Sequence, residues 1–471
     1  MQPTLEQLRE RYGARYKWLV LLTVMIGTIA SIISSTIVNV AVPDLSRHFV
    51  LGQERAQWVS AGFMLAMTLS MLTTPWLLLR YGLRRTYTGA ILLLLAGGAI
   101  GGFSINYPML LSMRIAEGLA AGILQPIPSI VILRAFSPQE QGKAMGVFGF
   151  GVVLAPAVGP SVGGFLVELF GWRSIFFVVV PVCVLVLLMI RRLLAVNSPM
   201  MGDARPLDWK GLLLAGVGTI ALLNGLVHLH DGFVQGVGLL ILGLAGIVGF
   251  VVYQLRTDSG LMNMTLFRYR QFSMGALVAF IYGAGLFGST YMLPVYMQMA
   301  LQYAPSQAGL ILLPAGIILA LTIYAAGKLA DRFAPNMLVS IGLCLLAASF
   351  ALMAFGSTAT SYLTLMIWAI IGRIGLGLVM PALSLGAMRG VEFSLIAQGA
   401  STINFLRQLG GAIGVSLVGI VLEWRLAVHQ AKADAQVLAF NETFLLVALL
   451  CAIAVLAAWR MRPLPTERSA A

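Results

Sequence analysis

Long runs of apolar residues, separated by short polar breaks, fill the sequence from residue 17 to residue 460. A helix needs about 20 mostly apolar residues to cross the roughly 30 Å of hydrocarbon in a bilayer. Runs of this size recur along the whole chain, and the breaks between them leave no room for a soluble domain. The pattern predicts fourteen membrane-spanning helices, at residues 17–43, 55–78, 87–105, 107–133, 144–168, 174–193, 209–229, 235–254, 272–296, 307–327, 338–356, 362–387, 397–422 and 442–460.

The runs fall into groups of six, two and six. Two pairs of segments are similar at nearly equal offsets: residues 75–85 resemble 327–334, and the surroundings of Arg114 resemble those of Arg373. Transporters are commonly built from such repeated bundles. We therefore expect a cytoplasmic N-terminal segment, a six-helix bundle, two inserted helices, a second six-helix bundle and a cytoplasmic tail, at residues 1–16, 17–193, 209–254, 272–460 and 461–471.

Composition and charge agree with a membrane protein. Of the residues, 59% are hydrophobic and only 10% are charged, which is too little polar surface for a soluble globule. The net charge is +13, and most Lys and Arg residues fall on the side of the membrane that carries the N-terminus, as the positive-inside rule requires. We expect both termini in the cytoplasm and the chain in the inner membrane of a bacterial cell. Because topology explains the basic charge, no nucleic-acid partner is expected.

Catalytic and metal-binding patterns are absent from the sequence. The three cysteines, Cys183, Cys344 and Cys451, lie in separate apolar runs, which argues against a disulfide framework or a metal site. There is no cluster of a nucleophile, a base and an orienting group, and no Gly-x-x-x-x-Gly-Lys string for ATP. We expect neither an enzyme nor a bound cofactor.

The most specific motif runs from Ala155 to Gly164 and is followed by Gly171, Trp172 and Arg173. Gly159 and Gly163 lie four residues apart on one helix face and have no side chains, so the backbone of a neighbouring helix can approach closely there. Pro160 would bend the helix. This string, which ends with Gly164, resembles the antiporter motif of the fourteen-helix drug:proton antiporters (EmrB/QacA type) of the major facilitator superfamily. Further segments, at residues 35–43, 206–211, 291–298 and 404–411, also resemble this family.

The resemblance implies a major facilitator fold, all-α and membrane-integral, with two six-helix bundles and two inserted helices. It implies proton-coupled efflux of drugs or other small, largely apolar molecules by alternating access. The partners would be the substrate, protons, the lipid bilayer and, where one exists, a periplasmic adaptor protein; we expect a monomer. Two departures, Ser34 and Leu79, stand where the family usually has an acid, and they favour the alternative of a uniporter or importer of a specific organic solute without proton coupling.

Glu117 is the only acidic residue that lies well inside a predicted span. Ionisable groups at this depth are costly and mark ion pathways in carriers. Burial disfavours the charged form of a carboxyl group and a nearby cation favours it. Arg114, three residues earlier, shares its helix face. We expect Glu117 and Arg114 to couple transport to protons; the alternative is a permanent internal ion pair.

Two further arginines, Arg373 and Arg407, lie in spans without an acid of their own. They either attract anionic substrates or pair with carbonyl groups and helix C-termini. Polar and aromatic residues in the spans are candidates for the lining of a substrate cavity, although each could instead face lipid or pack between helices. The candidate substrate-binding residues are Asn39, Gln125, Tyr282, Tyr291, Tyr296, Gln298, Arg373, Asn404 and Arg407.

The loop motif that begins at Gly327 contains Asp331 and Arg332. The resemblance implies that these two charges pair with helix ends and hold one conformation until the halves of the protein rock. The alternative is that both are solvated loop charges.

Overall fold

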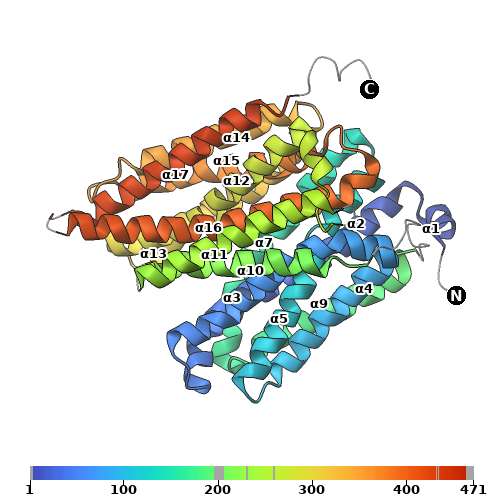
Figure 1. The fold of residues 1–471 in the computed structure, drawn as a ribbon, viewed down its shortest axis with the longest axis horizontal. Helices are drawn as coiled ribbons and strands as arrows, with labels where there is room; N and C mark the ends of the chain where they lie inside the picture. Colours follow the sequence, from blue (N-terminus) through green and yellow to red (C-terminus); the bar gives the residue numbers. More distant parts are fainter. Residues whose placement is uncertain are drawn as a thin grey trace. The chain divides into compact units, whose positions relative to one another are not determined.

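The computed structural model describes residues 4–195, 206–229, 232–257, 260–430, 432 and 434–462, and within these the side chains of 53, 54, 157, 158, 160, 161, 233, 305 and 306 lie outside the description. The described residues form α-helices with short 3-10 turns and one π-helical turn, and contain no β-strand. The α-helices are α1 (Leu5–Tyr12), α2 (Tyr16–His48), α3 (Gln53–Ser70), α4 (Thr74–Gly102), α5 (Tyr107–Leu124), α6 (Ile127–Ala135), α7 (Pro138–Phe170), α8 (Ser174–Phe177), α9 (Val179–Leu193), α10 (Trp209–His228), α11 (Phe233–Arg256), α12 (Arg270–Val295), α13 (Pro305–Ala330), α14 (Pro335–Met353), α15 (Tyr362–Met388), α16 (Ile396–His429) and α17 (Ala435–Trp459) (Figure 1).

Each of the fourteen predicted spans overlaps one or more of these helices. By length and composition, twelve helical stretches in the described part of the chain could cross a membrane. One of them, Arg55–Gly102, covers the predicted span 55–78 and most of the span 87–105. The predicted span 144–168 lies in α7, which is not among the twelve. The predicted all-α membrane fold is therefore confirmed, with 12 to 14 apolar helices.

Glycine and proline mark where helices end or bend. Gly82, inside α4, has φ 75° and ψ 169°, a conformation that is essentially restricted to glycine, so the chain turns here between two spans. Gly171 ends α7 with φ 75°, and its N–H donates to the carbonyl oxygen of Val167 at 2.9 Å. Pro126 separates α5 from α6. Gly82 and Gly171 thus separate successive spans, whereas Pro126 interrupts a single span, Tyr107–Ala135.

The contacts between residues divide the chain into two units. Unit 1 comprises residues 1–137, 150–212 and 259–262, and unit 2 comprises 138–149, 213–258 and 263–471. The predicted domain boundaries given above remain predictions. A cluster in unit 1 packs Ile37, Val38 and Leu45 of α2 against the aromatic rings of Trp172 and Phe176.

In unit 2, helices α12 and α16 approach each other through glycines. A Cβ atom added to Gly283 would overlap the carbonyl of Arg407, and one added to Gly410 would overlap the carbonyl of Phe280. A Cβ on Gly414 would overlap Ala284. Backbones can approach this closely only where side chains are missing. We call these contacts the glycine seam.

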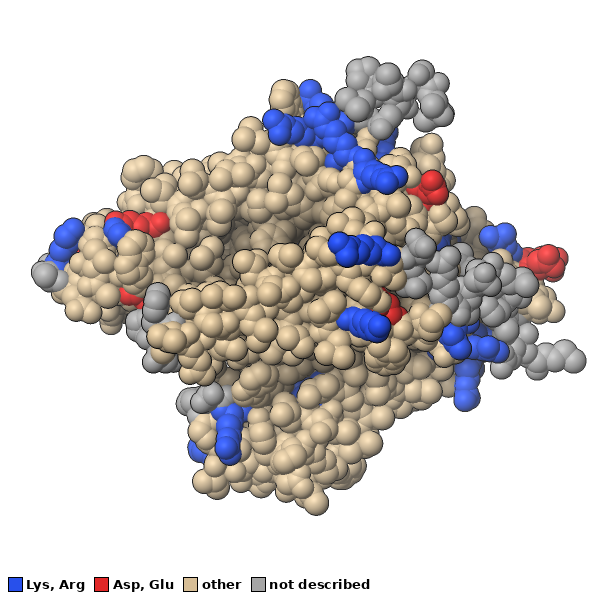
Figure 2. All heavy atoms as spheres, viewed as in Figure 1, with Lys and Arg blue, Asp and Glu red and all other residues tan. Residues whose placement is uncertain are grey.

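Large apolar side chains cover much of the exposed surface. On α10 and α11, Leu213, Ile241 and Leu255 are 67%, 64% and 66% exposed. Figure 2 shows a face that is mostly uncharged, with Lys and Arg confined to a few places. Such surface needs lipid as its solvent.

Candidate functional site

An ion pair between Arg114 and Glu117 lies inside unit 1. Both residues belong to α5 and are three positions apart, so they share one face of the helix. Their side chains are 0% and 1% exposed. The structure thus brings together the two residues that we predict for proton coupling, and places them away from solvent; the coupling itself remains a prediction.

Two neighbouring helices supply further partners for this pair. Arg114 donates from Nε to the carbonyl oxygen of Val59 in α3 at 3.3 Å, and from Nη1 to the carbonyl oxygen and Oγ of Ser34 in α2 at 3.3 and 3.2 Å. The Ser34 hydroxyl also lies beside the Glu117 carboxyl group. The guanidinium carbon of Arg114 lies 4.3 Å from the ring centroid of Phe63, which adds a cation–π contact. Ser34, where the resemblance leads us to expect an acid, therefore touches both charges.

The side of the pair that faces α4 is closed by glycines. A Cβ on Gly97 would lie 2.5 Å from Cγ of Glu117, and one on Gly98 would lie 3.4 Å from its Oε1. The same Cβ on Gly98 would lie 2.9 Å from the carbonyl oxygen of Phe176. The carboxyl group is thus enclosed by backbone, and a change in its charge would be felt by α2, α4 and α5 together.

A second polar cluster lies in unit 2. Tyr282 of α12 is 2% exposed and donates its hydroxyl to the carbonyl oxygen of Leu376 in α15 at 3.2 Å. Arg407 of α16 donates to the amide oxygen of Asn404 at 2.8 Å. Both Arg407 and Arg373 interact electrostatically with Tyr282. Four of the candidate substrate residues, Tyr282, Asn404, Arg407 and Arg373, therefore form one cluster that contains two cations.

The other candidate substrate residues are not part of either cluster. Asn39 is exposed and accepts a hydrogen bond from the Ser60 hydroxyl at 2.7 Å. Tyr291 and Gln298 are exposed, and Gln125 is half-buried at the end of α5. Tyr296 is 1% exposed. The centroid of its ring lies 5.3 Å from the ring centroids of both Phe440 and Phe444. Their part in substrate binding remains a prediction.

The glycines of the α7 motif pack against α2. A Cβ on Gly159 would lie 3.6 Å from Cβ of Thr36 and still closer to its hydroxyl, and one on Gly163 would lie 3.3 Å from the carbonyl oxygen of Ile37. A Cβ on Gly164 would meet only Val40, at 3.9 Å. The side chain of Pro160 lies outside the described side chains. The two glycines four residues apart allow the close helix contact that their spacing predicts.

The loop motif at the end of α13 contacts the start of α7 within unit 2. The Asp331 carboxylate accepts hydrogen bonds from the backbone N–H groups of Gly142 and Lys143 at 2.6 and 2.8 Å. A carboxylate is favourable near a helix N-terminus. Gly327 lies against Gly142 so closely that a Cβ would overlap its carbonyl oxygen. Burial raises the pKa of the Asp331 carboxyl, and the two N–H groups oppose this shift. Arg332 is exposed.

Sequence reasoning did not pair Ser34 with Arg114, because the two residues are 80 positions apart and no periodicity links them. It also missed α1. Thr4 and Gln7 form a capping box at the start of this helix, a signal that the sequence carries. The helix contributes to a cavity described below.

The described residues form long apolar helices, and a buried Arg–Glu pair lies inside unit 1; this is the architecture of a multi-pass membrane protein. The profile of the Major Facilitator Superfamily matches residues 24–415. The chain belongs to this superfamily.

Named relatives agree with this assignment. The uncharacterized MFS-type transporter YhcA of Bacillus subtilis is 30% identical over 415 residues, which are 88% of this chain and 78% of YhcA. A multidrug resistance protein B homolog of Mycobacterium tuberculosis is 31% identical over 425 residues, again 88% and 78% of the two chains. The solved structure of the proton:xylose symporter XylE has a TM-score of 0.66 at 14% identity, over 93% of this chain and 95% of XylE. The last likeness concerns the fold alone. The predicted family is confirmed.

Proposed function

We propose that this transporter exports apolar small molecules, including drugs, in exchange for protons, and that Glu117 carries the proton. The observation that carries the proposal is the buried pair of Glu117 with Arg114, hydrogen-bonded to Ser34. When Glu117 is ionised, the pair is neutral overall; when it is protonated, an uncompensated Arg114 charge stays in the membrane interior. Because such a charge is costly, protonation would favour a different packing of α2, α3 and α5, as alternating access requires.

Efflux is supported by the multidrug resistance protein B homolog among the relatives and by the antiporter-type motif, whose Gly159 and Gly163 pack against α2. The cationic cluster of Arg373, Arg407 and Tyr282 in unit 2 would favour substrates that carry a negative charge or an acidic group. The positive-inside distribution of Lys and Arg supports an inner-membrane location with both termini in the cytoplasm.

The test is transport by the purified protein in proteoliposomes under an imposed pH gradient. The probes are ethidium, as a lipophilic cation, and dichlorofluorescein, as an organic anion. We expect the gradient to drive accumulation of at least one probe in the wild type. Comparison of the two probes shows whether the transporter prefers a cationic or an anionic substrate.

Glu117→Gln separates coupling from folding. The variant should lose gradient-driven accumulation but keep exchange of labelled for unlabelled probe, since exchange requires no net proton movement. Glu117→Asp keeps a titratable group and should keep coupling at a reduced rate. Glu168→Gln removes an exposed carboxylate at the end of α7 and should behave as the wild type.

The alternative of a uniporter or importer is supported by Ser34 and Leu79. It predicts that Glu117→Gln leaves the wild-type rates unchanged and that the pH gradient drives no probe. Either result would contradict the proposed proton exchange.

A further inference from the structure

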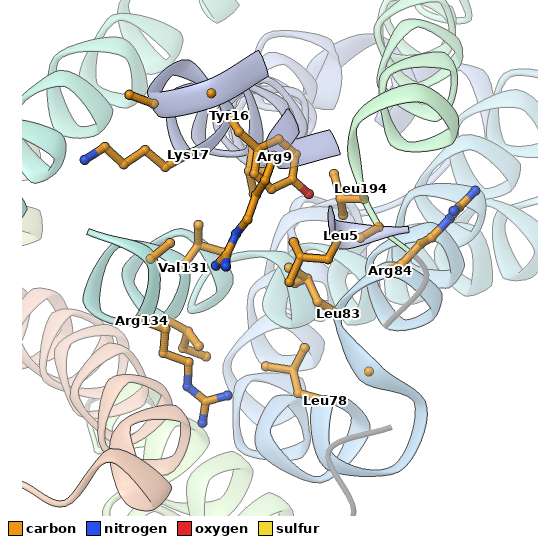
Figure 3. Close-up of a pocket in the computed structure, with 17 residues that line it drawn as sticks. Leu5, Arg9, Tyr16, Lys17, Leu78, Leu83, Arg84, Val131, Arg134 and Leu194 are labelled. Carbon is orange, nitrogen blue, oxygen red and sulfur yellow. The ribbon is translucent and has the colours of Figure 1, made fainter. Parts of the chain in front are cut away.

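A cavity of about 570 Å³ lies at one end of unit 1 (Figure 3). Its walls come from α1, the start of α2, the Gly82 turn in α4, the end of α6 and the residues that follow α9. Each of these segments lies where a predicted span begins or ends on the side of the N-terminus. The cavity is therefore at the level where the helices leave the hydrocarbon, and it is distinct from the Arg114–Glu117 pair.

The charged residues that line this cavity are all basic: Arg9, Lys17, Arg84 and Arg134. Figure 3 shows the guanidinium group of Arg9 beside Val131, whereas the Arg134 side chain extends downwards in the view, Arg84 extends from the opposite side and Lys17 points away. The Lys17 amino group lies 5.3 Å from the ring centroid of Phe136 and is engaged there. Arg9, Arg84 and Arg134 all line the cavity, and together with Lys17 they give it a positive potential.

The acids of α1 do not neutralise this site. Glu6 and Glu10 are exposed and are absent from the lining. At 100° per residue, Leu5, Leu8 and Arg9 share one helix face, and Glu6 and Glu10 lie on another. Leu8 is 2% exposed, which fixes the face that α1 turns towards the bundle. The helix thus presents Leu5 and Arg9 to the cavity and its acids to the outside.

The rest of the lining is largely apolar. Leu78, Leu83, Ile130 and Val131 form a hydrophobic wall beside the cations. A free inorganic anion would leave this wall uncovered, whereas a molecule with a phosphate group and a hydrocarbon part would use both. Basic pockets at the membrane surface recognise lipid headgroups in this way.

We propose that the cavity binds an anionic phospholipid, with Arg9 and Arg134 on its phosphate group and the wall of Leu78, Leu83 and Val131 against the start of its hydrocarbon chains. The lipid links α1 to the Gly82 turn and to the end of α6. This site goes beyond the proposed export function and does not depend on it.

Native mass spectrometry of the delipidated full-length protein tests the proposal. The probes are dioleoylphosphatidylglycerol, dioleoylphosphatidylcholine with the same chains, and soluble glycerol 3-phosphate. We expect phosphatidylglycerol to bind in preference to phosphatidylcholine, and Arg9→Gln and Arg134→Gln each to weaken its binding by roughly fivefold.

Arg191→Gln and Arg192→Gln are the matched controls. Both residues are exposed at the end of α9, on the same side of the membrane, and neither lines the cavity. They should leave phosphatidylglycerol binding unchanged. Size-exclusion chromatography verifies that each variant is folded, and Arg9→Lys, which keeps the charge, should retain most of the binding.

Three results would overturn the proposal. Equal binding of the two lipids would exclude recognition of charge, and equal losses in the control variants would exclude this site. Competition by glycerol 3-phosphate at the same concentration as the lipid would show that a soluble phosphate compound is the occupant and that the hydrocarbon wall has no part.

Discussion

Replacing Arg114 or Glu117 by methionine should destabilise the protein strongly, whereas replacing both should not. Each single replacement leaves one charge in an interior where the side chains are 0% and 1% exposed. Breaking a buried ion pair on one side costs about 3–5 kcal/mol, whereas an apolar pair of similar volume is often neutral. Methionine adapts to the shape of the site.

The double replacement leaves few unsatisfied groups. The carbonyl oxygens of Val59 and Ser34 lie inside α3 and α2, where they also accept helical N–H groups. We therefore expect the double variant within about 2 kcal/mol of the wild type. The double-mutant cycle should give a coupling free energy of at least about 4 kcal/mol between the two positions.

Unfolding by SDS in mixed micelles measures these differences. Cys183 and Cys451 are buried and Cys344 is exposed. In a Cys344→Ser background, a thiol-reactive dye therefore reacts only when unfolding exposes the two buried cysteines. Additive losses, with the double variant as unstable as the sum of the single variants, would refute the reasoning. A stable double variant that no longer couples transport to protons would separate the role of the pair in transport from its role in folding.

Three further predictions use the same unfolding measurement. Gly163→Ala should destabilise the protein by more than Gly164→Ala, because only the first Cβ would collide with Ile37; equal effects would contradict the packing of α7 on α2. Gly82→Ala should cost about 1–3 kcal/mol, since alanine is strained at φ 75°, and a neutral effect would exclude the positive φ. Burial raises the pKa of Asp331, so the native state binds this proton more tightly than the unfolded state, and the free energy of unfolding should increase as the pH falls from the raised pKa to the ordinary pKa. The Asp331→Asn variant should lack this increase, and identical pH profiles of the variant and the wild type would contradict the reasoning.

The helices could be predicted because each apolar run has to supply its own backbone hydrogen bonds in lipid. The helix α1 escaped prediction because only one of its residues, Leu8, is buried, too few for an apolar run. The break at Pro126 fell inside a predicted span, since apolar residues continue on both sides of it. A hydropathy pattern identifies the segments that cross the membrane, but it does not detect a helix break such as the one at Pro126.

The candidate sites were predictable only where their members are close in sequence. Arg114 and Glu117 are neighbours on one helix face, and their spacing alone brings them together. The contact of Arg114 with Ser34 spans 80 residues and depends on how helices pack, which no local pattern contains. Asp331 illustrates the intermediate case: its motif implied a helix end as partner, and the structure identifies the N–H groups of Gly142 and Lys143.

The glycine seam between α12 and α16 limits how this transporter can evolve. At Gly283, Gly410 and Gly414 every single-residue substitution adds at least a Cβ atom where a neighbouring backbone or side chain already lies. Natural variation should therefore be confined to the other faces of these two helices, among them the face of α12 that carries Tyr282. Under the proposed export function, new substrate preferences would arise there by replacement of side chains on an unchanged helix pair, without any change to the scaffold.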